Sequence, residues 1–255
     1  MSASPKGAAL VTGAAKRIGR ALALALAEDG YDIAIHFHSS ADEAESAAAA
    51  VRAHGRRCAL VRANLAREDE TARVIDAAVK GVGPLRILVN SASAFEADDL
   101  FTMTRAIWDR HIETNLRAPL KLIQDFARAA DPHSDALVVN ILDQRVLKLT
   151  PQFLSYTVSK SALFALTHTL AQALGPRGVR VNAIGPGPTI RNARQSEDDF
   201  RRQTESTVLG RGASTGDIAG ALRYLIGARA VTGQMIAVDG GQHLIWRTPD
   251  VLAGE

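Results

Sequence analysis

The chain has 255 residues, of which 47% are hydrophobic and 22% are charged, and its formal net charge at pH 7 is +3. This composition is typical of a globular protein with a large buried core, and it excludes a disordered or fibrous chain. Lys and Arg occur in runs no longer than pairs, so the slight excess of positive charge favours an anionic ligand and argues against nucleic acid.

Residues 1–7 lack the long apolar core of a signal peptide, and no later apolar run approaches the roughly 20 residues needed to span a bilayer. The single cysteine, Cys58, cannot form an internal disulfide, which is compatible with a reducing compartment. We therefore expect a cytoplasmic protein with no membrane partner.

Short apolar runs rich in Val, Ile and Leu recur along the chain, and segments with helical spacing separate them. The runs occupy residues 8–11, 32–37, 58–62, 86–89, 136–142, 179–184 and 235–238. A regular alternation of strand and helix indicates an α/β fold with a parallel sheet and helices on both faces. No linker, composition shift or fixed-period repeat divides the chain, so we expect one domain over residues 1–255.

The first predicted strand leads into Thr-Gly-Ala-Ala-Lys-Arg-Ile-Gly at residues 12–19. A glycine turn between a strand and a helix presents free backbone N–H groups to a pyrophosphate, with Gly13 for the tight turn and Gly19 for close packing. Lys16, Arg17 and Ile18 complete this candidate cofactor loop, and the Arg17 guanidinium can make charge-assisted contacts with phosphate. The alternative is an ordinary turn with a solvated arginine.

The end of the second predicted strand bears on the choice of dinucleotide. NAD-specific proteins usually carry an Asp or Glu here to hold the ribose 2′-hydroxyl. This chain has His36, His38, Ser39 and Ser40 instead, with no carboxylate before Asp42. Imidazole, hydroxyl and backbone N–H groups could meet a 2′-phosphate, so the sequence favours NADPH over NADH.

Helix boundaries are marked at two places. Ser40 with Glu43 predicts a capping box at the start of a helix that Gly55 is placed to end. Ser214 with Asp217 predicts a second capping box.

The segment at about 185–206 interrupts the alternation of strands and helices. Pro186, Gly187 and Pro188 break the strand pattern before a polar, charged stretch. Long irregular segments of this kind are often functional, so we expect a lid or substrate loop here.

A candidate catalytic pair lies at the start of a long helical pattern, where Tyr156 and Lys160 are four residues apart and therefore share one helix face. A phenol with its ordinary pKa near 10 is a poor acid at neutral pH. A nearby ammonium group would lower that pKa, so Tyr156 could donate a proton as hydride arrives from a nicotinamide. A solvated helix face is the alternative interpretation of the pair.

Taken together, these motifs resemble those of the short-chain dehydrogenase/reductase family. The matching residues are Thr12, Gly13 and Gly19, the run Asn90, Ser91, Ala92 and Ser93, then Asn115, Tyr156 and Lys160, Pro186 and Gly187, and the final Val238, Asp239, Gly240 and Gly241. The resemblance implies a Rossmann-type, doubly wound sheet of seven parallel strands, a nicotinamide cofactor and a homotetramer. It also implies that residues 90–93 and 186–187 contact the cofactor, that Lys160 holds the nicotinamide ribose, and that Asn115 supports a proton-relay water.

One departure from the family pattern concerns Asp143. Most members carry a serine about a dozen residues before the tyrosine, but this chain has Asp143 there. An ionised carboxylate accepts hydrogen bonds and cannot donate them, so it suits a substrate with N–H groups or a site that passes a proton. A solvated aspartate at the end of a strand is the alternative.

Together with Arg17 in place of a glycine, and with Phe95, the aspartate resembles the pteridine reductase branch. That similarity implies that Phe95 forms one wall of a slot for a flat pterin, and that Arg17 reaches both phosphate and substrate. Ser93, Asp143 and Tyr156 complete the implied substrate site.

Some positions fit that branch less well. Ser39 stands where an arginine often meets the 2′-phosphate, and Ser91 replaces a second asparagine. Asn64, next to Leu65, stands where an aspartate commonly meets the adenine amino group, although an amide oxygen can also accept that bond.

The preferred hypothesis is hydride transfer from NADPH to a C=N bond of a pterin-like heterocycle of the dihydropterin or dihydrofolate type. A rival hypothesis keeps the scaffold and reduces a ketone or a 3-oxoacyl group. A third is an NADPH-binding sensor without catalysis. We expect no metal, because His36 and His38 are the only histidines with ligand-like spacing, and their place at the cofactor edge explains them equally well.

Overall fold

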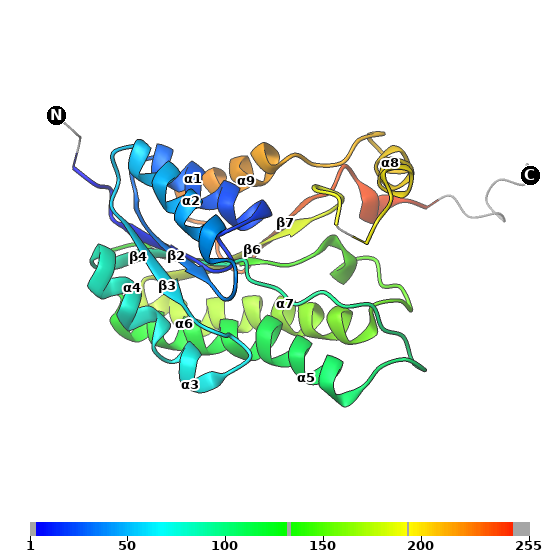
Figure 1. The fold of residues 1–255 in the computed structure, drawn as a ribbon, viewed down its shortest axis with the longest axis horizontal. Helices are drawn as coiled ribbons and strands as arrows, with labels where there is room; N and C mark the ends of the chain where they lie inside the picture. The colour runs from blue at the N-terminus through cyan, green and yellow to red at the C-terminus, as the bar shows by residue number, and fades with distance from the viewer. Residues whose placement is uncertain (1–3, 132–133, 193, 247–255) are drawn as a thin grey trace, which may run out of the picture.

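The computed structural model describes residues 4–131, 134–192 and 194–246. Its centre is a sheet of seven parallel strands in the order β3-β2-β1-β4-β5-β6-β7 (Figure 1). The strands are β1 (Ala8–Val11), β2 (Asp32–Phe37), β3 (Cys58–Arg62), β4 (Leu85–Asn90), β5 (Ala136–Ile141), β6 (Val179–Pro186) and β7 (Met235–Val238). All seven predicted strands are confirmed, with small differences at the ends of β4, β5 and β6.

Two helix layers cover the sheet. Figure 1 shows α1 (Arg17–Glu28), α2 (Ala41–Ala53) and α9 (Thr215–Gly227) on one face, and α4 (Val74–Val82), α6 (Ala118–Ala129) and α7 (Leu154–Leu174) on the other. The remaining α-helices are α3 (Glu68–Thr71), α5 (Arg105–Ile112) and α8 (Glu197–Glu205). Within the described part of the chain, no helix is long and apolar enough to cross a bilayer.

Each face of the sheet has its own hydrophobic core. Alternate residues of a strand point to opposite faces, so Val11 packs on the side of α1 while Leu10 packs on the side of α6. The strand order reverses between β1 and β4, and in open parallel sheets ligands bind beyond the carboxyl ends of the strands at such a reversal. The predicted Rossmann-type, doubly wound fold is confirmed, and it directs attention to this crevice.

Of the two predicted capping boxes, one is present and one is not. Ser214 Oγ accepts a hydrogen bond from Asp217 N at 3.1 Å, and Ser214 N donates to the Asp217 carboxylate at 2.8 Å. At the start of α2, however, the Ser40 side chain makes no capping bond. The predicted box is wrong there because Glu43 pairs with Lys16 Nζ at 2.6 Å instead.

The predicted loop at 185–206 is more ordered than expected. Its first two residues continue β6, whose pairing with β7 runs to Pro186 and Val238. Its last part forms α8, whose N-cap Ser196 accepts a hydrogen bond from Asp199 N at 3.0 Å. Among the described residues, the irregular portion is therefore restricted to 187–192 and 194–195.

The contrast between the two caps can be measured. Ser214→Ala removes a side chain that accepts a helix N–H, so we expect the free energy of unfolding to fall by about 1 kcal/mol. Ser40→Ala removes a side chain with no such bond, so its effect should stay within about 0.5 kcal/mol. Urea unfolding followed by circular dichroism would measure both, and equal losses in the two variants would contradict the assignment.

Candidate active site

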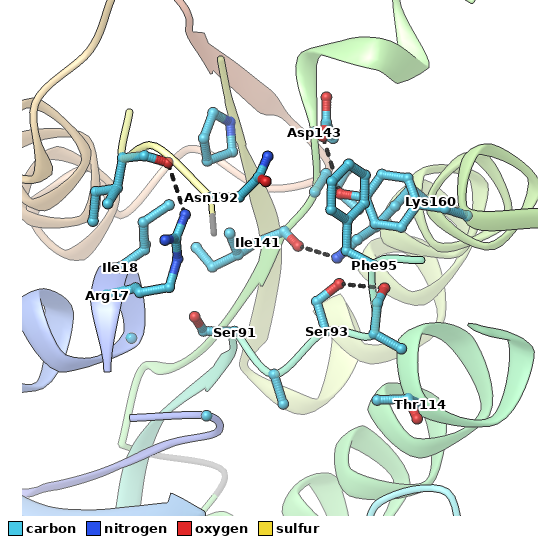
Figure 2. A pocket seen from close by; sticks show the side chains of 18 of the residues that line it. Arg17, Ile18, Ser91, Ser93, Phe95, Thr114, Ile141, Asp143, Lys160 and Asn192 are labelled. Atoms are coloured by element: carbon cyan, nitrogen blue, oxygen red, sulfur yellow. Dashed lines mark hydrogen bonds between the residues drawn. The ribbon is translucent and has the colours of Figure 1, made fainter. Parts of the chain in front are cut away.

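A cavity of about 1210 Å³ lies beyond the carboxyl ends of the central strands. Most predicted site residues line it, namely Gly13, Lys16, Arg17, Ile18, Gly19, His36, His38, Asn64, Leu65, Ser91, Ala92, Ser93, Phe95, Asp143, Tyr156, Lys160, Pro186 and Gly187. Figure 2 shows Arg17 and Ile18 at one end of the cavity and Asp143, Lys160 and Phe95 at the other. The fold therefore brings the candidate cofactor loop and the candidate catalytic residues into one site.

The loop between β1 and α1 is built for close backbone packing. Gly13 has a φ of +64°, and a Cβ placed there would lie 2.8 Å from Ala92 Cα. A Cβ on Gly19 would lie 2.4 Å from the Gly13 carbonyl oxygen. Thr12 Oγ1 accepts hydrogen bonds from Ser91 N at 2.9 Å and Ala92 N at 3.0 Å. These contacts leave the N-terminus of α1 facing the cavity, an arrangement that suits a pyrophosphate.

Arg17 connects this loop to the segment that follows β6. Its guanidinium donates hydrogen bonds to the carbonyl oxygens of Ile190 at 2.8 Å and Arg191 at 2.9 Å. Its backbone φ of +53° is unusual for a residue with a side chain. The predicted contacts of Arg17 with phosphate and substrate remain predictions.

His36 has a structural role that the sequence did not indicate. Its Nδ1 accepts a hydrogen bond from Gly13 N at 3.2 Å, so its Nε2 carries the proton and donates to the Ala63 carbonyl at 3.1 Å. Burial lowers the pKa of this imidazole to about 4. His36 is therefore a neutral support for the candidate cofactor loop, with both ring nitrogens bonded to the backbone, and its contact with a 2′-phosphate stays a prediction. His38 is exposed at the cavity edge.

Four predicted site residues are not part of the cavity lining: Ser39, Ser40, Asn90 and Asn115. The buried Asn90 amide donates to Asn140 Oδ1 at 2.9 Å, so its side chain joins β4 to β5. At the adenine end, Asn64 Oδ1 accepts from Ala66 N at 3.0 Å.

Asn115 lies in a π-helical turn, Glu113–Arg117, between α5 and α6. Its Oδ1 accepts from Ala94 N at 2.7 Å and from Ser93 Oγ at 3.2 Å. Its Nδ2 donates to the Ala94 carbonyl at 2.9 Å and to Ser159 Oγ at 3.1 Å. Protein groups thus use the full bonding capacity of the side chain, and Asn115 positions the backbone that follows β4. Its support of a proton-relay water stays a prediction.

The start of α7 is secured from a distance by Asp98. Phe153, the N-cap residue, adopts a left-handed conformation and provides no side-chain cap. The Asp98 carbonyl accepts from Phe153 N at 2.7 Å, and its carboxylate accepts from Ser155 N at 3.2 Å. The same carboxylate accepts from Ser155 Oγ, which in turn contacts His111 Nδ1 at 2.7 Å. This buried network holds the helical turn that carries Tyr156.

Tyr156 and Asp143 form the centre of the candidate active site. The Tyr156 hydroxyl donates to Asp143 Oδ2 at 3.0 Å. Lys160 Nζ donates to the Ile141 carbonyl at 2.8 Å, which holds the amine at the end of β5. Tyr156 is 5% exposed and Lys160 is 3% exposed. Three ionisable groups therefore meet in a site from which water is largely excluded.

Burial governs the acidity of these groups. It raises the pKa of the Tyr156 hydroxyl well above the ordinary value of 10, and the neighbouring Asp143 raises it further. Burial also raises the pKa of the Asp143 carboxyl and lowers that of Lys160 to about 8. The expectation that Lys160 makes the tyrosine more acidic is therefore not met, because desolvation and the carboxylate dominate. The shared proton resides on Tyr156.

Aromatic side chains border this pair. The Phe95 ring stacks on Phe153 with centroids 4.5 Å apart and meets Tyr156 edge-on at 4.7 Å. The guanidinium of Arg194 lies 5.7 Å from the centre of the Phe95 ring, and that of Arg145 lies 5.2 Å from the centre of Phe153.

Sequence reasoning missed several residues of the cavity lining, including Gln144, Arg145, Thr189, Ile190, Asn192, Arg194, Gln195, Phe200, Gln203 and Gln242. Gln144 and Arg145 directly follow Asp143 and could have been found from that proximity. The others lie after β6, where no local pattern indicates which side chains turn inward.

Comparisons with known proteins agree with this geometry. Residues 13–243 match the family profile described as "Enoyl-(Acyl carrier protein) reductase". A 3-oxoacyl-[acyl-carrier-protein] reductase FabG of Staphylococcus epidermidis is 33% identical over 240 residues, covering 92% of this chain and 98% of that protein. This similarity indicates a common family and does not by itself show a common substrate.

Two solved structures are similar over nearly the whole chain. FolM alternative dihydrofolate reductase 1 from Brucella suis, in complex with NADP, is 46% identical with a TM-score of 0.91, covering 98% of both chains. A blue fluorescent protein from a metagenomic library, in complex with NADPH, is 31% identical with a TM-score of 0.87, covering 95% of this chain and 99% of that chain. The chain therefore belongs to the short-chain dehydrogenase/reductase family and is an NAD(P)H-dependent oxidoreductase.

Proposed function

We propose that the protein reduces a C=N bond of a pterin-like heterocycle, of the dihydropterin or dihydrofolate type, with NADPH as hydride donor. The observation that carries this proposal is the hydrogen bond between Tyr156 and Asp143 at 3.0 Å. A carboxylate in this position can accept a hydrogen bond from a substrate N–H, and after taking up a proton from solvent it can pass that proton to the tyrosinate. The FolM alternative dihydrofolate reductase of Brucella suis, 46% identical, supports the same substrate class.

The cavity fits a dinucleotide. Gly13 and Gly19 would allow the cofactor to approach the backbone closely, and the N-terminus of α1 suits its pyrophosphate. Lys160 lines the same cavity, within reach of the nicotinamide end of the cofactor. The Brucella suis protein was crystallised with NADP, and the protein from the metagenomic library with NADPH. When bound, this cofactor would supply the hydride.

The chain's own residues would supply the proton and stabilise the group that loses it. Tyr156 donates its proton to the substrate nitrogen, and Asp143 stabilises the hydroxyl in the orientation that its hydrogen bond defines. Lys160, held by the Ile141 carbonyl, places a positive charge beside the phenolate as it forms. Phe95 would form the wall against which a flat ring packs.

A second candidate is reduction of a ketone or a 3-oxoacyl group. The 33% identity to the FabG of Staphylococcus epidermidis favours it. One observation argues against it. Asp143 accepts a hydrogen bond from the Tyr156 hydroxyl, whereas a serine in its place would donate a hydrogen bond to a substrate carbonyl oxygen. The two candidates therefore make opposite demands on the residue at position 143.

Exchange of that residue separates the candidates. In Asp143→Ser we expect NADPH-dependent reduction of dihydrobiopterin and dihydrofolate to fall at least about 100-fold, because proton return to Tyr156 is lost. Reduction of simple ketones should be retained or increased. Tyr156→Phe should abolish both, because the proton donor is gone. NADPH absorbance with the substrates side by side would measure these rates.

Three results would contradict this assignment. Turnover of ketones by the wild type, without turnover of any pterin, would make the second candidate correct. Full activity of Tyr156→Phe would remove Tyr156 from its role. NADPH-dependent thermal stabilisation without turnover of any substrate would instead indicate a sensor.

The preference for NADPH should depend on the end of β2. In His38→Asp, a carboxylate at the cavity edge would repel a 2′-phosphate and accept a hydrogen bond from a ribose hydroxyl. We expect the KM for NADPH to rise at least about tenfold and the KM for NADH to fall. His168→Asp, an exposed change on α7, is the matched control. An unchanged ratio of the two KM values in His38→Asp would argue against a 2′-phosphate site here.

Lys160 should lower the stability of the folded protein, although the proposed reaction requires it. Its pKa is about 8 in the folded protein against an ordinary 10.5, so the unfolded chain binds more protons between these values and stability rises with pH there. The penalty of the buried charge is complete below pH 8 and is relieved as the pH rises. Lys160→Met should therefore unfold at a higher temperature than the wild type at pH 7, with a smaller difference at pH 9.5, while reductase activity is lost.

Differential scanning calorimetry at several pH values would test this. Lys80→Met, an exposed change on α4, is the control and should show no pH-dependent difference. If the unfolding temperature of Lys160→Met exceeded that of the wild type by an amount that grew with pH, the result would contradict a buried charge on Lys160.

A further inference from the structure

The catalytic end of the cavity carries two arginines that the reaction does not use. Arg145 follows Asp143 in a short 3-10 turn, and Arg194 lies in the segment after β6; both line the cavity. Neither forms an ion pair with a carboxylate among the residues that the structure describes. Of the other cationic residues that line this cavity, Lys16 pairs with Glu43 and Arg110 with Glu96, whereas Arg17 and Lys160 donate to backbone carbonyls.

The partners of both guanidiniums are neutral. Arg145 donates to Thr150 Oγ1 and to the Gln152 carbonyl, and its Nε is buried without any hydrogen-bond partner. Arg194 donates to the Phe95 carbonyl. Carbonyl and hydroxyl oxygens satisfy part of a guanidinium's five donors but do not neutralise its charge.

The carboxylates that line the described part of the cavity form no ion pair with these two arginines. Asp109 lies on α5 and pairs with Arg105 at 2.7 Å, and Glu113 lies in the π-helical turn that follows. Asp143 accepts hydrogen bonds from Tyr156 and from the backbone N–H of Arg145 at 2.8 Å, and the Arg145 charge opposes part of the rise that burial causes in the pKa of the Asp143 carboxyl. The wall around Arg145 and Arg194 therefore presents two guanidiniums without an ion-pair partner to whatever enters beside the catalytic pair.

The two arginines flank the aromatic pair at a short distance from the reacting groups. Arg145 lies over Phe153 and Arg194 over Phe95, while Phe95 meets Tyr156 edge-on at 4.7 Å. A ring held at Phe95 with its reactive bond at Tyr156 would thus place a side arm of a few atoms within reach of a guanidinium.

We propose that Arg145 and Arg194 form a subsite for the carboxylates of an acidic side arm on the substrate, and that this subsite favours carboxylate-bearing pterins over neutral ones. The inference rests on the proposed function and assigns its specificity. A planar guanidinium can bind a carboxylate through two parallel, charge-assisted hydrogen bonds. A neutral side arm with hydroxyl groups forms weaker hydrogen bonds with it.

Binding of a ring at Phe95 would change the position of Arg194. One face of Phe95 is packed on Phe153, and Arg194 lies over the same ring. A flat ring stacking on Phe95 would require this guanidinium to shift, and a carboxylate on the side arm would provide it with a stronger partner than the aromatic face.

The test compares two substrates that share the pterin ring, dihydrofolate with a glutamyl side arm and dihydrobiopterin with a neutral one. Arg145→Met should raise the KM for dihydrofolate about tenfold, as expected for loss of one charge-assisted contact, and leave that for dihydrobiopterin within about twofold. Arg145→Lys should be intermediate, because it keeps the charge and loses the planar fork. Arg201→Met, on α8 and paired with Asp198 at 2.9 Å, is the control.

A binding measurement separates this inference from the proposed reaction. Calorimetric titration of p-aminobenzoylglutamate, the acidic arm alone, into the NADPH-loaded protein should show binding that weakens about tenfold in Arg145→Met. If the wild type reduces no pterin but binds this arm through Arg145, the proposed function fails and the subsite stands. Equal KM changes for both substrates, or binding of the arm that Arg145→Met does not alter, would overturn the subsite.

Discussion

A partly buried hydrogen bond, from the Tyr156 hydroxyl to the Asp143 carboxylate, connects the residues that follow β5 to the first turn of α7. Its geometry depends on both elements, since β5 pairs on either side within the sheet and α7 is capped from outside by Asp98. The segment that follows β4 supplies that cap and also carries Phe95. The aromatic wall and the proton donor are therefore placed by the same stretch of chain.

The balance of charges in the site differs from the simple expectation of a lysine tuning a tyrosine. Desolvation disfavours every ionised form, and an adjacent carboxylate makes loss of the tyrosine proton harder still. Lys160 feels the same desolvation, which lowers its pKa to about 8. In the proposed reaction, a phenol that keeps its proton until the substrate nitrogen accumulates electron density would be a suitable donor, because it does not lose that proton to solvent beforehand.

Features set by local pattern could be predicted from the sequence, and features set by long-range contacts could not. The seven strands follow from short apolar runs, and the α9 cap follows from Ser214 and Asp217 alone. Ser40 fails as a cap because Glu43 is engaged by Lys16. The role of His36 depends on Gly13 and Ala63, which are distant in sequence. The homotetramer and the single domain over residues 1–255 remain predictions.

The segment after β6 links the two ends of the cavity. Arg17 of the phosphate loop donates to the carbonyls of Ile190 and Arg191, while Arg194 donates to the carbonyl of Phe95. The segment thus contacts both the candidate cofactor loop and the aromatic wall. Because the Arg17 guanidinium donates two hydrogen bonds to this segment, a displacement of that side chain would remove two of the contacts that hold the segment in place.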